Sequence, residues 1–489
     1  MAQPTGPPAG ARVEILNADV WEFDDQLSAG AQRLKGNVRF KHADAIMNCD
    51  SAHLFKDQRV EAFGHVTIDQ GDSLHADADR LHYDSKERMA RLEGNVRLRD
   101  RDMELSTAAL DYDLRNRSAS YATGGIIVSN REGNTLTSGA GTYHAAQRRF
   151  VFSRNVHLQH PERTIDSDTM HYVTSTGMTE FFGATTITQG DNVIKTLRGT
   201  YDTRTDRARF TRRSSVLSNG RLLEGDSLHY DRATGQGLAW GHVAVTDSSG
   251  DMRALGDRGQ YNERDDRSMI TGRAELVMRM GSDTLFLHGD TLFTAPDGPG
   301  RRIIARRHVR FFKSDMQGAC DTLTYSDADS LIRMHHRPVL WSGTDQITGE
   351  AVRIELRDGM AHRLFVEGNA FLVSQADSIH FDQVTGSMMT GYFKDNELHR
   401  LDAEGNARTV YFAREKKGDK EEIIGVNRAD CSRIRVVMAE GHVSKVTFLD
   451  RPDAVLYPLE KAPADELLME GVEFRGAERP TDRAAIFLP

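Results

Sequence analysis

Acidic side chains recur at one position of a repeated phrase, and they are the first candidates for chemistry in this chain. The position is occupied by Asp50, Asp79, Asp168, Asp226, Asp257, Asp290, Asp321 and Asp377. Such a ladder predicts either a cation site, for example for calcium, or a local device that accepts backbone N–H bonds at turns. Ala108, Gly139 and Leu197 interrupt the ladder, and no unit supplies the denser oxygen cluster that calcium requires. The structural interpretation is therefore favoured.

Histidine recurs at the position before the aromatic position of the same phrase, at His53, His82, His171, His229 and His380. A metal ladder would need adjacent units and carboxylate support, so we expect these side chains to face solvent and pair across strands. The chain has no G-x-S-x-G elbow, phosphate-binding glycine loop, H-E-x-x-H or Cys-x-x-Cys motif. Catalytic groups belong to one place, whereas these carboxylates belong to every unit. We expect no catalytic residues, no cofactor, no metal and no enzyme activity.

One segment is strongly basic. Its charges are Arg301, Arg302, Arg306, Arg307, Arg310 and Lys313, beside two phenylalanines. They could contact phosphate groups or an acidic partner, or they could form a solvated strand face. The formal net charge of −9 weighs against a nucleic-acid partner. Cys49 and Cys320 occupy the small position of the phrase, which indicates small buried residues and not a redox pair.

The element that must position all these residues is a repeat of about 30 residues. Its first half-phrase occurs twelve times at steps of 27 to 33 residues, beginning at Met47, Ala76, Leu105, Leu136, Ile165, Ile194, Leu223, Ala254, Leu287, Gly318, Ile347 and Ser374. So regular a period is typical of an array in which each unit packs on its neighbours.

Each repeat predicts paired strands that bend. Ala90, Leu92, Val96 and Leu98 share one parity, as expected of a strand with one buried face. Gly94 in mid-strand predicts a bulge or a corner. In the first half-phrase the apolar parity switches between Ala78 and Leu81, which indicates that the chain passes there from one sheet to another.

We expect three regions: a disordered leader over residues 1–12, a repeat array over residues 13–412, and a cap or docking segment over residues 413–489. In the last region we predict an exposed loop over Arg414–Glu422 and a short helix over Asp465–Glu470. No run approaches 18 apolar residues, so a transmembrane helix is not expected. The first ten residues lack the apolar stretch of a signal peptide, and we expect them to begin a mature exported chain.

Two phrases of the repeat, Ala76–Asp84 and Ala90–Asp100, resemble the OstA family, which includes LptA-like lipopolysaccharide-transport proteins and the N-terminal domain of LptD. The resemblance covers roughly residues 13–412. It implies an all-β fold, an elongated open β-jellyroll or solenoid-like array of about twelve repeats with two packed twisted sheets. It also implies a periplasmic protein whose apolar interior receives the acyl chains of lipopolysaccharide or a related glycolipid. Self-association by end-to-end sheet stacking, or contact with other lipopolysaccharide-transport proteins, follows from the same resemblance.

The interior of such a fold would be lined by the residues of buried parity. The lipid-lining candidates are Leu81, Tyr83, Leu92, Val96, Leu98, Leu110, Tyr112, Met170, Tyr172, Leu228, Tyr230 and Val243. The same residues could instead pack the two sheets together with no room for lipid. Two alternatives to the lipid carrier therefore stay open. The first alternative is a non-transporting envelope scaffold with a filled core, and the next is a β-helix polysaccharide lyase.

Overall fold

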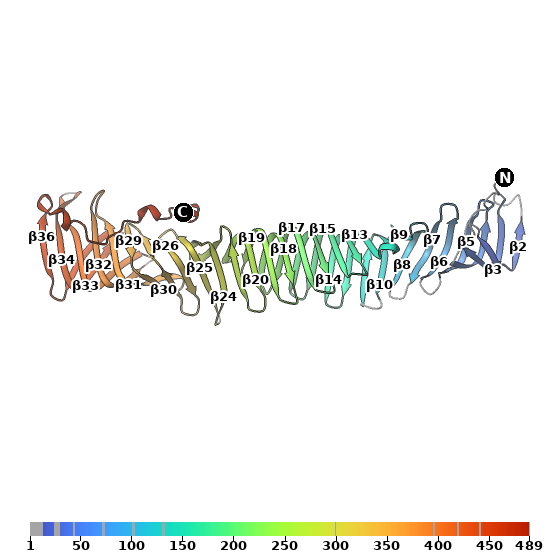
Figure 1. Cartoon of the computed structure of the whole chain (residues 1–489), viewed down its shortest axis with the longest axis horizontal. Helices are drawn as coiled ribbons and strands as arrows, with labels where there is room; N and C mark the ends of the chain where they lie inside the picture. The colour runs from blue at the N-terminus through green and yellow to red at the C-terminus, as the bar shows by residue number, and fades with distance from the viewer. Residues whose placement is uncertain are drawn as a thin grey trace, which may run out of the picture. The chain divides into compact units, whose positions relative to one another are not determined.

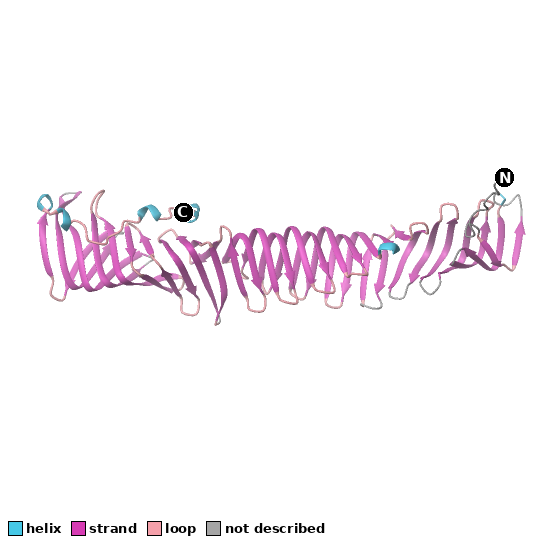
Figure 2. Cartoon of the chain, viewed as in Figure 1, coloured by secondary structure: helices cyan, strands magenta, loops and turns pink. Residues whose placement is uncertain are grey.

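The chain is almost wholly β-structure in the computed structural model, and successive strands lie side by side within each compact unit (Figures 1 and 2). The structure describes residues 13–23, 30–42, 45–70, 74–99, 103–129, 133–298, 300–394, 397–417, 420–439 and 442–488. Unit 1 comprises Met1–Asn219 and Ser227–Ala233, and unit 2 comprises Gly220–Asp226 and Thr234–Pro489. The predicted leader, residues 1–12, lies outside the described residues. The all-β fold class is confirmed.

In its described residues unit 1 is built from antiparallel strands, with a 3-10 turn between two of them. Its elements are β1 (Glu14–Asn17), β2 (Val20–Phe23), β3 (Gln32–His42), β4 (Ala45–Leu54), β5 (Arg59–Gln70), β6 (Leu74–Asp84), β7 (Met89–Arg99), β8 (Met103–Asp113), β9 (Ser118–Tyr121), β10 (Gly125–Ser129), β11 (Asn134–Ser138), β12 (Ala140–His144), η2 (Ala145–Gln147), β13 (Arg149–His160), β14 (Arg163–Val173), β15 (Met178–Gln189), β16 (Asn192–Asp202) and β17 (Arg207–Ser218). β18 (Arg221–Asp231) contributes residues to both units.

Unit 2 continues the same alternation and ends in short 3-10 turns. Its elements are β19 (Gln236–Thr246), β20 (Met252–Asn262), β21 (Arg267–Thr271), β22 (Glu275–Met280), β23 (Asp283–His288), β24 (Thr291–Asp297), β25 (Gly300–Phe312), β26 (Gln317–Ser326), β27 (Leu331–His335), β28 (Val339–Ser342), β29 (Asp345–Thr348), β30 (Ala351–Arg357), β31 (Met360–Gln375), β32 (Phe381–Lys394), β33 (Glu397–Lys417), β34 (Lys420–Ala439), β35 (His442–Leu449), β36 (Asp453–Pro458), η3 (Leu459–Lys461), η4 (Ala464–Glu466), η5 (Gly476–Glu478) and η6 (Ala484–Phe487).

Each long strand takes part in two sheets because it bends in the middle. β8 shows this directly: residues 103–107 pair with β10, whereas residues 111–113 pair with β9. We call the sheet that contains the β8–β9 pairs sheet A and the sheet that contains the β8–β10 pairs sheet B. The switch of apolar parity is confirmed, since Ala76 and Ala78 are buried before the bend and Leu81 and Tyr83 after it. The two sheets pack against each other as the two layers of a β-jellyroll.

The bend itself is a β-bulge at glycine, as the sequence predicts. The register of β6 on β7 shifts between Arg80 and Asp77, and Gly94 and Asn95 both have positive φ, at 77° and 49°. A Cβ atom on Gly94 would lie 2.4 Å from Asp79 Oδ2. Glycine is therefore required by its conformation and by the close approach of the carboxylate.

The recurring aspartates act as structural bridges at these corners. Asp79 Oδ2 accepts a hydrogen bond from Asn95 Nδ2 at 2.8 Å, and Asp168 Oδ2 accepts one from the backbone N–H of Ala184 at 2.9 Å. Asp226 lies 2.7 Å from His242 Nδ1. Among the described residues, no group of metal-binding side chains comes together that could hold an ion. These contacts support the interpretation that the aspartates stabilise the corners locally. The donors to these carboxylates are more often side-chain N–H groups than the backbone N–H groups that we predicted.

The small position of the phrase closes the same corner from inside. Ser167 Oγ and Thr196 Oγ1 each donate to the carbonyl oxygen two residues further on, at 3.1 and 3.0 Å. Cys320 Sγ makes the equivalent contact with Thr322 O at 3.3 Å. Cys320 and Cys49 are buried free thiols, and burial raises the pKa of each to about 12. Both cysteines are therefore small packing residues held as neutral thiols.

We use the same names in unit 2, where sheet A contains the β26–β27 pairs and sheet B contains the β26–β28 pairs. The C-terminal part of unit 2, residues 459–488, forms an extended strap on the outer face of this sheet B. Gln383 and Gln346 each make two hydrogen bonds to the strap backbone, at Leu467 and Met469 and at Glu473 and Arg475. This cover explains why all four residues of β28 are buried, because the strand has the core on one face and the strap on the other.

Two local predictions for this region are wrong. The expected loop over Arg414–Glu422 is the end of a hairpin, because β33 and β34 stay paired as far as Lys417 and Lys420. The expected helix over Asp465–Glu470 is a single 3-10 turn, η4. Both predictions rested on the local density of charged residues. Charge density does not show how far a strand extends past the ends of neighbouring strands. The domain boundary at residue 412 stays a prediction, although β33 runs across it without a break.

Candidate functional site

The candidate site is the space between the two sheets of unit 1. Its first cavity has a volume of about 90 Å³. The lining is apolar except for His42, Gln70 and the tyrosine hydroxyls, and consists of Val13, Phe40, His42, Ala45, Met47, Ile68, Gln70, Ala76, Leu81, Tyr83, Ala90, Leu92, Leu98, Leu110, Tyr112 and Leu114. Alternation places these side chains inside, since each strand turns every second residue toward the opposite sheet.

A second cavity of about 60 Å³ adjoins the first. Leu98 lines both, and the other lining residues are Met103, Leu105, Ala119, Tyr121, Ile127, Thr142, Tyr143 and Phe150. Tyr121, which lines this cavity, makes a buried hydrogen bond of 2.7 Å between its Oη and Ser138 Oγ. The two apolar cavities are thus neighbours that share Leu98 in their walls, and together we call them the apolar stretch of unit 1.

The first cavity lies near the hairpin turns, on the side away from the bulges. Tyr83, Tyr112 and Leu114 approach it from the turns of sheet A, and His42 and Ala45 approach it from the turns of sheet B. We call this side of the sandwich the mouth. Tyr83 Oη and His42 Nε2 are 3.4 Å apart across it. Burial, followed by the Arg88 charge, lowers the pKa of His42, so this contact joins two neutral groups at neutral pH.

The predicted lining residues occupy three kinds of position. Six of them line the first cavity: Leu81, Tyr83, Leu92, Leu98, Leu110 and Tyr112. Val96, Met170, Leu228 and Val243 are buried in the packed interior, and Tyr172 and Tyr230 are half-buried. Sequence reasoning missed His42, Met47, Met103 and Phe150. The signal that could have found them is inward parity.

The predicted basic segment is dispersed along β25 and does not form one site. Arg301 and Arg302 are paired with Asp266 and Asp297 at 3.1 and 2.8 Å, and Lys313 is paired with Asp315 at 2.6 Å. The Arg306 guanidinium stacks on Phe293, Arg310 bonds to the carbonyl oxygen of Leu488, and Arg307 lies exposed in the bulge. The charges of the segment thus point to different faces. Phosphate binding by this segment stays a prediction.

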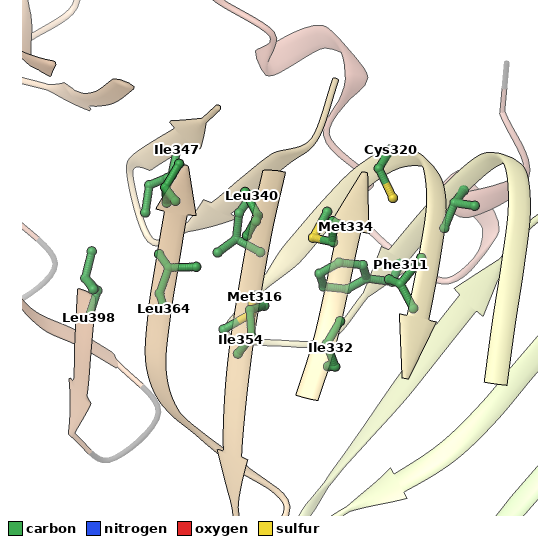
Figure 3. Packing of buried hydrophobic residues seen from close by; sticks show 14 of the residues in the cluster. Phe311, Met316, Cys320, Ile332, Met334, Leu340, Ile347, Ile354, Leu364 and Leu398 are labelled. Carbon is green, nitrogen blue, oxygen red and sulfur yellow. The ribbon is translucent and has the colours of Figure 1, made fainter. Parts of the chain in front are cut away.

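The interior of unit 2 is mostly packed, with a partly polar recess of about 500 Å³ at the turns beside Asp266, Arg301 and Tyr325. Phe311, Met334, Leu340 and Ile354 belong to one continuous cluster of buried residues between its sheets (Figure 3). A cavity of about 40 Å³ remains beside Met316. No helix in the described parts of the chain is long and apolar enough to cross a bilayer.

The comparisons with known proteins agree with the repeat phrases. Residues 10–168 match the family model described as OstA-like protein. No curated protein sequence matches the chain. Among solved structures, LptH of Pseudomonas aeruginosa, described as the LptA homologous periplasmic component of its lipopolysaccharide transport device, is 13% identical; the match covers 29% of this chain and 95% of LptH at a TM-score of 0.23. That score is too low to support an argument. The family model supports the resemblance to the OstA family over residues 10–168.

Proposed function

We propose that the chain is a periplasmic lipid-binding bridge that shields the acyl chains of lipopolysaccharide, or of a related glycolipid, during transport to the outer membrane. The observation that carries the proposal is the apolar stretch of unit 1, the two neighbouring cavities that share Leu98 in their walls. The OstA-like match covers the same residues. An apolar interior suits an acyl chain because each methylene removed from water contributes about 0.8 kcal/mol.

The size of the first cavity adds a requirement. Its volume of about 90 Å³ is smaller than the roughly 150 Å³ cavity that admits benzene in an engineered protein. An acyl chain therefore enters only if the two sheets move apart at the mouth. The weak neutral contact between His42 and Tyr83 at this place makes such a movement inexpensive.

The edges of the two units support a bridging arrangement by sheet stacking. β1 and β2 pair with β3, and Trp21 and Phe23 of β2 are 60% and 58% exposed. At the other end of the chain β35 and β36 pair with β34, and Leu456 is 58% exposed. We propose that these edges bind a second copy or another transport protein, because unpaired strand edges favour association.

A non-transporting scaffold is the second candidate, and unit 2 favours it. Its core is packed, and the strap covers the outer face of its sheet B. Lipid bound in unit 1 would indicate a carrier, whereas an interior without lipid would indicate a scaffold.

The test places a photo-crosslinking amino acid at Leu98, which lines both cavities. The matched control is Arg97, the adjacent residue, which is exposed on the other face of β7. After irradiation in a lipopolysaccharide-producing host, the Leu98 variant should yield a covalent lipid adduct and the Arg97 variant should not. Absence of an adduct at Leu98 in folded, secreted protein would exclude the carrier function and leave the scaffold.

A further inference from the structure

The mouth of unit 1 carries one tyrosine from each repeat on its sheet A side except the first, which has Leu54 at this position. These residues are Tyr83, Tyr112, Tyr143, Tyr172, Tyr201 and Tyr230. They face inward because they share parity with buried neighbours, as Tyr83 does with Leu81. On the sheet B side, Arg163 begins β14 and shares parity with buried Ile165. A cationic side chain thus points into the mouth opposite the tyrosines.

Arg163 links the two sheets through Tyr201 and Asp206. Arg163 Nη1 donates to Tyr201 Oη at 2.6 Å, and its guanidinium lies 5.0 Å from the centre of the tyrosine ring. Tyr201 Oη donates to Asp206 Oδ1 at 2.5 Å, and Asp206 Oδ1 lies 3.8 Å from Arg163 Nη1. The Arg163 side chain is 13% exposed. A charged, largely desolvated side chain held by these contacts resists separation of the sheets.

This contact is stronger than the one across the mouth at the first cavity. There the bridge is His42 and Tyr83, two groups without charge at neutral pH and 3.4 Å apart. Hydrogen bonds that involve an ionised group are roughly twice as strong as neutral ones. The mouth of unit 1 is thus held weakly beside the cavities and firmly at Arg163.

Unit 2 contains the same arrangement in its own mouth, which argues against accident. Arg221 begins β18 two residues before the first apolar residue of its phrase, as Arg163 does, and it forms a two-bonded pair with Asp266. Asp266 also accepts hydrogen bonds from Tyr261 at 3.3 Å and from Arg301 at 3.1 Å. An inward arginine of sheet B again meets a tyrosine and an aspartate of sheet A.

We propose that Arg163, Tyr201 and Asp206 form a gate that closes the mouth of unit 1 and confines a bound acyl chain to the stretch that precedes it. This inference rests on the proposed lipid-binding function. For the chain to pass, the sheets must part at Arg163, which breaks its charged hydrogen bond to Tyr201 and its ion pair with Asp206. The interior behind the gate is also less apolar, because buried hydroxyl pairs join Ser167 to Thr185 and Thr196 to Ser214.

The experiment reads lipid occupancy on both sides of the gate in the full-length chain. One photo-crosslinker replaces Leu98 before the gate, and another, in a separate protein, replaces Ile187, which is buried behind it and pairs with Ile165. With Arg163 intact, lipid should attach at Leu98 and not at Ile187. Arg163→Met keeps the apolar stem and removes the charge, and it should raise attachment at Ile187 roughly tenfold, the factor that one charge-assisted hydrogen bond represents.

Two further variants keep the test decisive. Tyr201→Phe removes the hydroxyl between Arg163 and Asp206 and should also raise attachment at Ile187 if Arg163→Met fails to fold. Arg207→Met breaks an exposed ion pair with Asp231 in the same unit and should leave attachment unchanged. Equal attachment at Ile187 with and without the gate residues would overturn the gate, whereas loss of attachment at Leu98 in every protein would instead refute lipid binding itself.

Discussion

The corner formed by Gly94 and Asp79 yields a prediction that can be worked out from its geometry. At Gly94, φ is 77°, and an alanine there costs about 1 kcal/mol for the left-handed conformation alone. Its Cβ would lie 2.4 Å from Asp79 Oδ2, so the carboxylate must move and release Asn95, at a further cost of about 1 kcal/mol. We therefore expect Gly94→Ala to destabilise this corner by about 2 kcal/mol.

A double-mutant cycle separates the two terms. Asp79→Ala should cost about 1 kcal/mol by itself, and in its presence Gly94→Ala should cost only the conformational term. The expected coupling is about 1 kcal/mol. Gly124→Ala is the matched control, because Gly124 has a φ of 86° and a Cβ atom at this position would meet no other atom within 4 Å; it should cost the conformational term without any coupling to Asp79.

Hydrogen exchange of the peptides that cover β6 and β7, followed by mass spectrometry, measures the local opening free energy. This readout suits a repeat array, whose denaturation need not be two-state. If Gly94→Ala costs no more than Gly124→Ala, and the double variant is the sum of the single ones, the proposed packing of the carboxylate on the glycine is wrong.

Three other predictions concern unit 2 and the edges. Asp345 is 3% exposed, and burial raises its pKa to about 7. Since this pKa exceeds the unfolded value near 3.9, the free energy of unfolding should fall by at most about 4 kcal/mol as the pH rises from about 4 to about 7. Urea titrations at several pH values should show that Asp345→Asn removes most of this pH dependence. Arg483→Ala leaves buried Glu275 without its two-bonded partner and should make the strap cleavable by limited proteolysis, whereas Arg337→Ala, which breaks an exposed pair, should not. Trp21→Lys should reduce self-association in sedimentation experiments without lowering thermal stability; unchanged association would argue against stacking through this edge.

The repeat made most of the fold predictable from the sequence. Alternation identified the buried face of β7, and the parity switch after Ala78 located the bend correctly because a period of two leaves no freedom in which side chains share a face. Gly94 predicted the bulge because only glycine tolerates both its φ and the adjacent carboxylate. Nothing local marked the strap, whose contacts with Gln346 and Gln383 join residues more than eighty positions apart.

The candidate site was predictable only in part. Inward parity selected Leu81, Leu92 and Leu98, which line the first cavity. Parity could not distinguish them from Met170, which is packed, because whether space remains between two sheets depends on the volumes of the facing side chains. The contact of Arg163 with Asp206 could not be predicted since it spans two hairpins, although an arginine at an inward position was the available signal.

The central claim is that unit 1 carries lipid, and mass spectrometry of organic extracts tests it most directly. The protein would be purified without detergent from a lipopolysaccharide-producing host and compared with a folded variant in which Leu98 is replaced by aspartate. Our account predicts stoichiometric lipid A, or a related acylated glycolipid, in the parent extract and its loss from the Leu98→Asp variant. A lipid-free extract from folded parent protein that also takes up no added lipopolysaccharide would contradict the account.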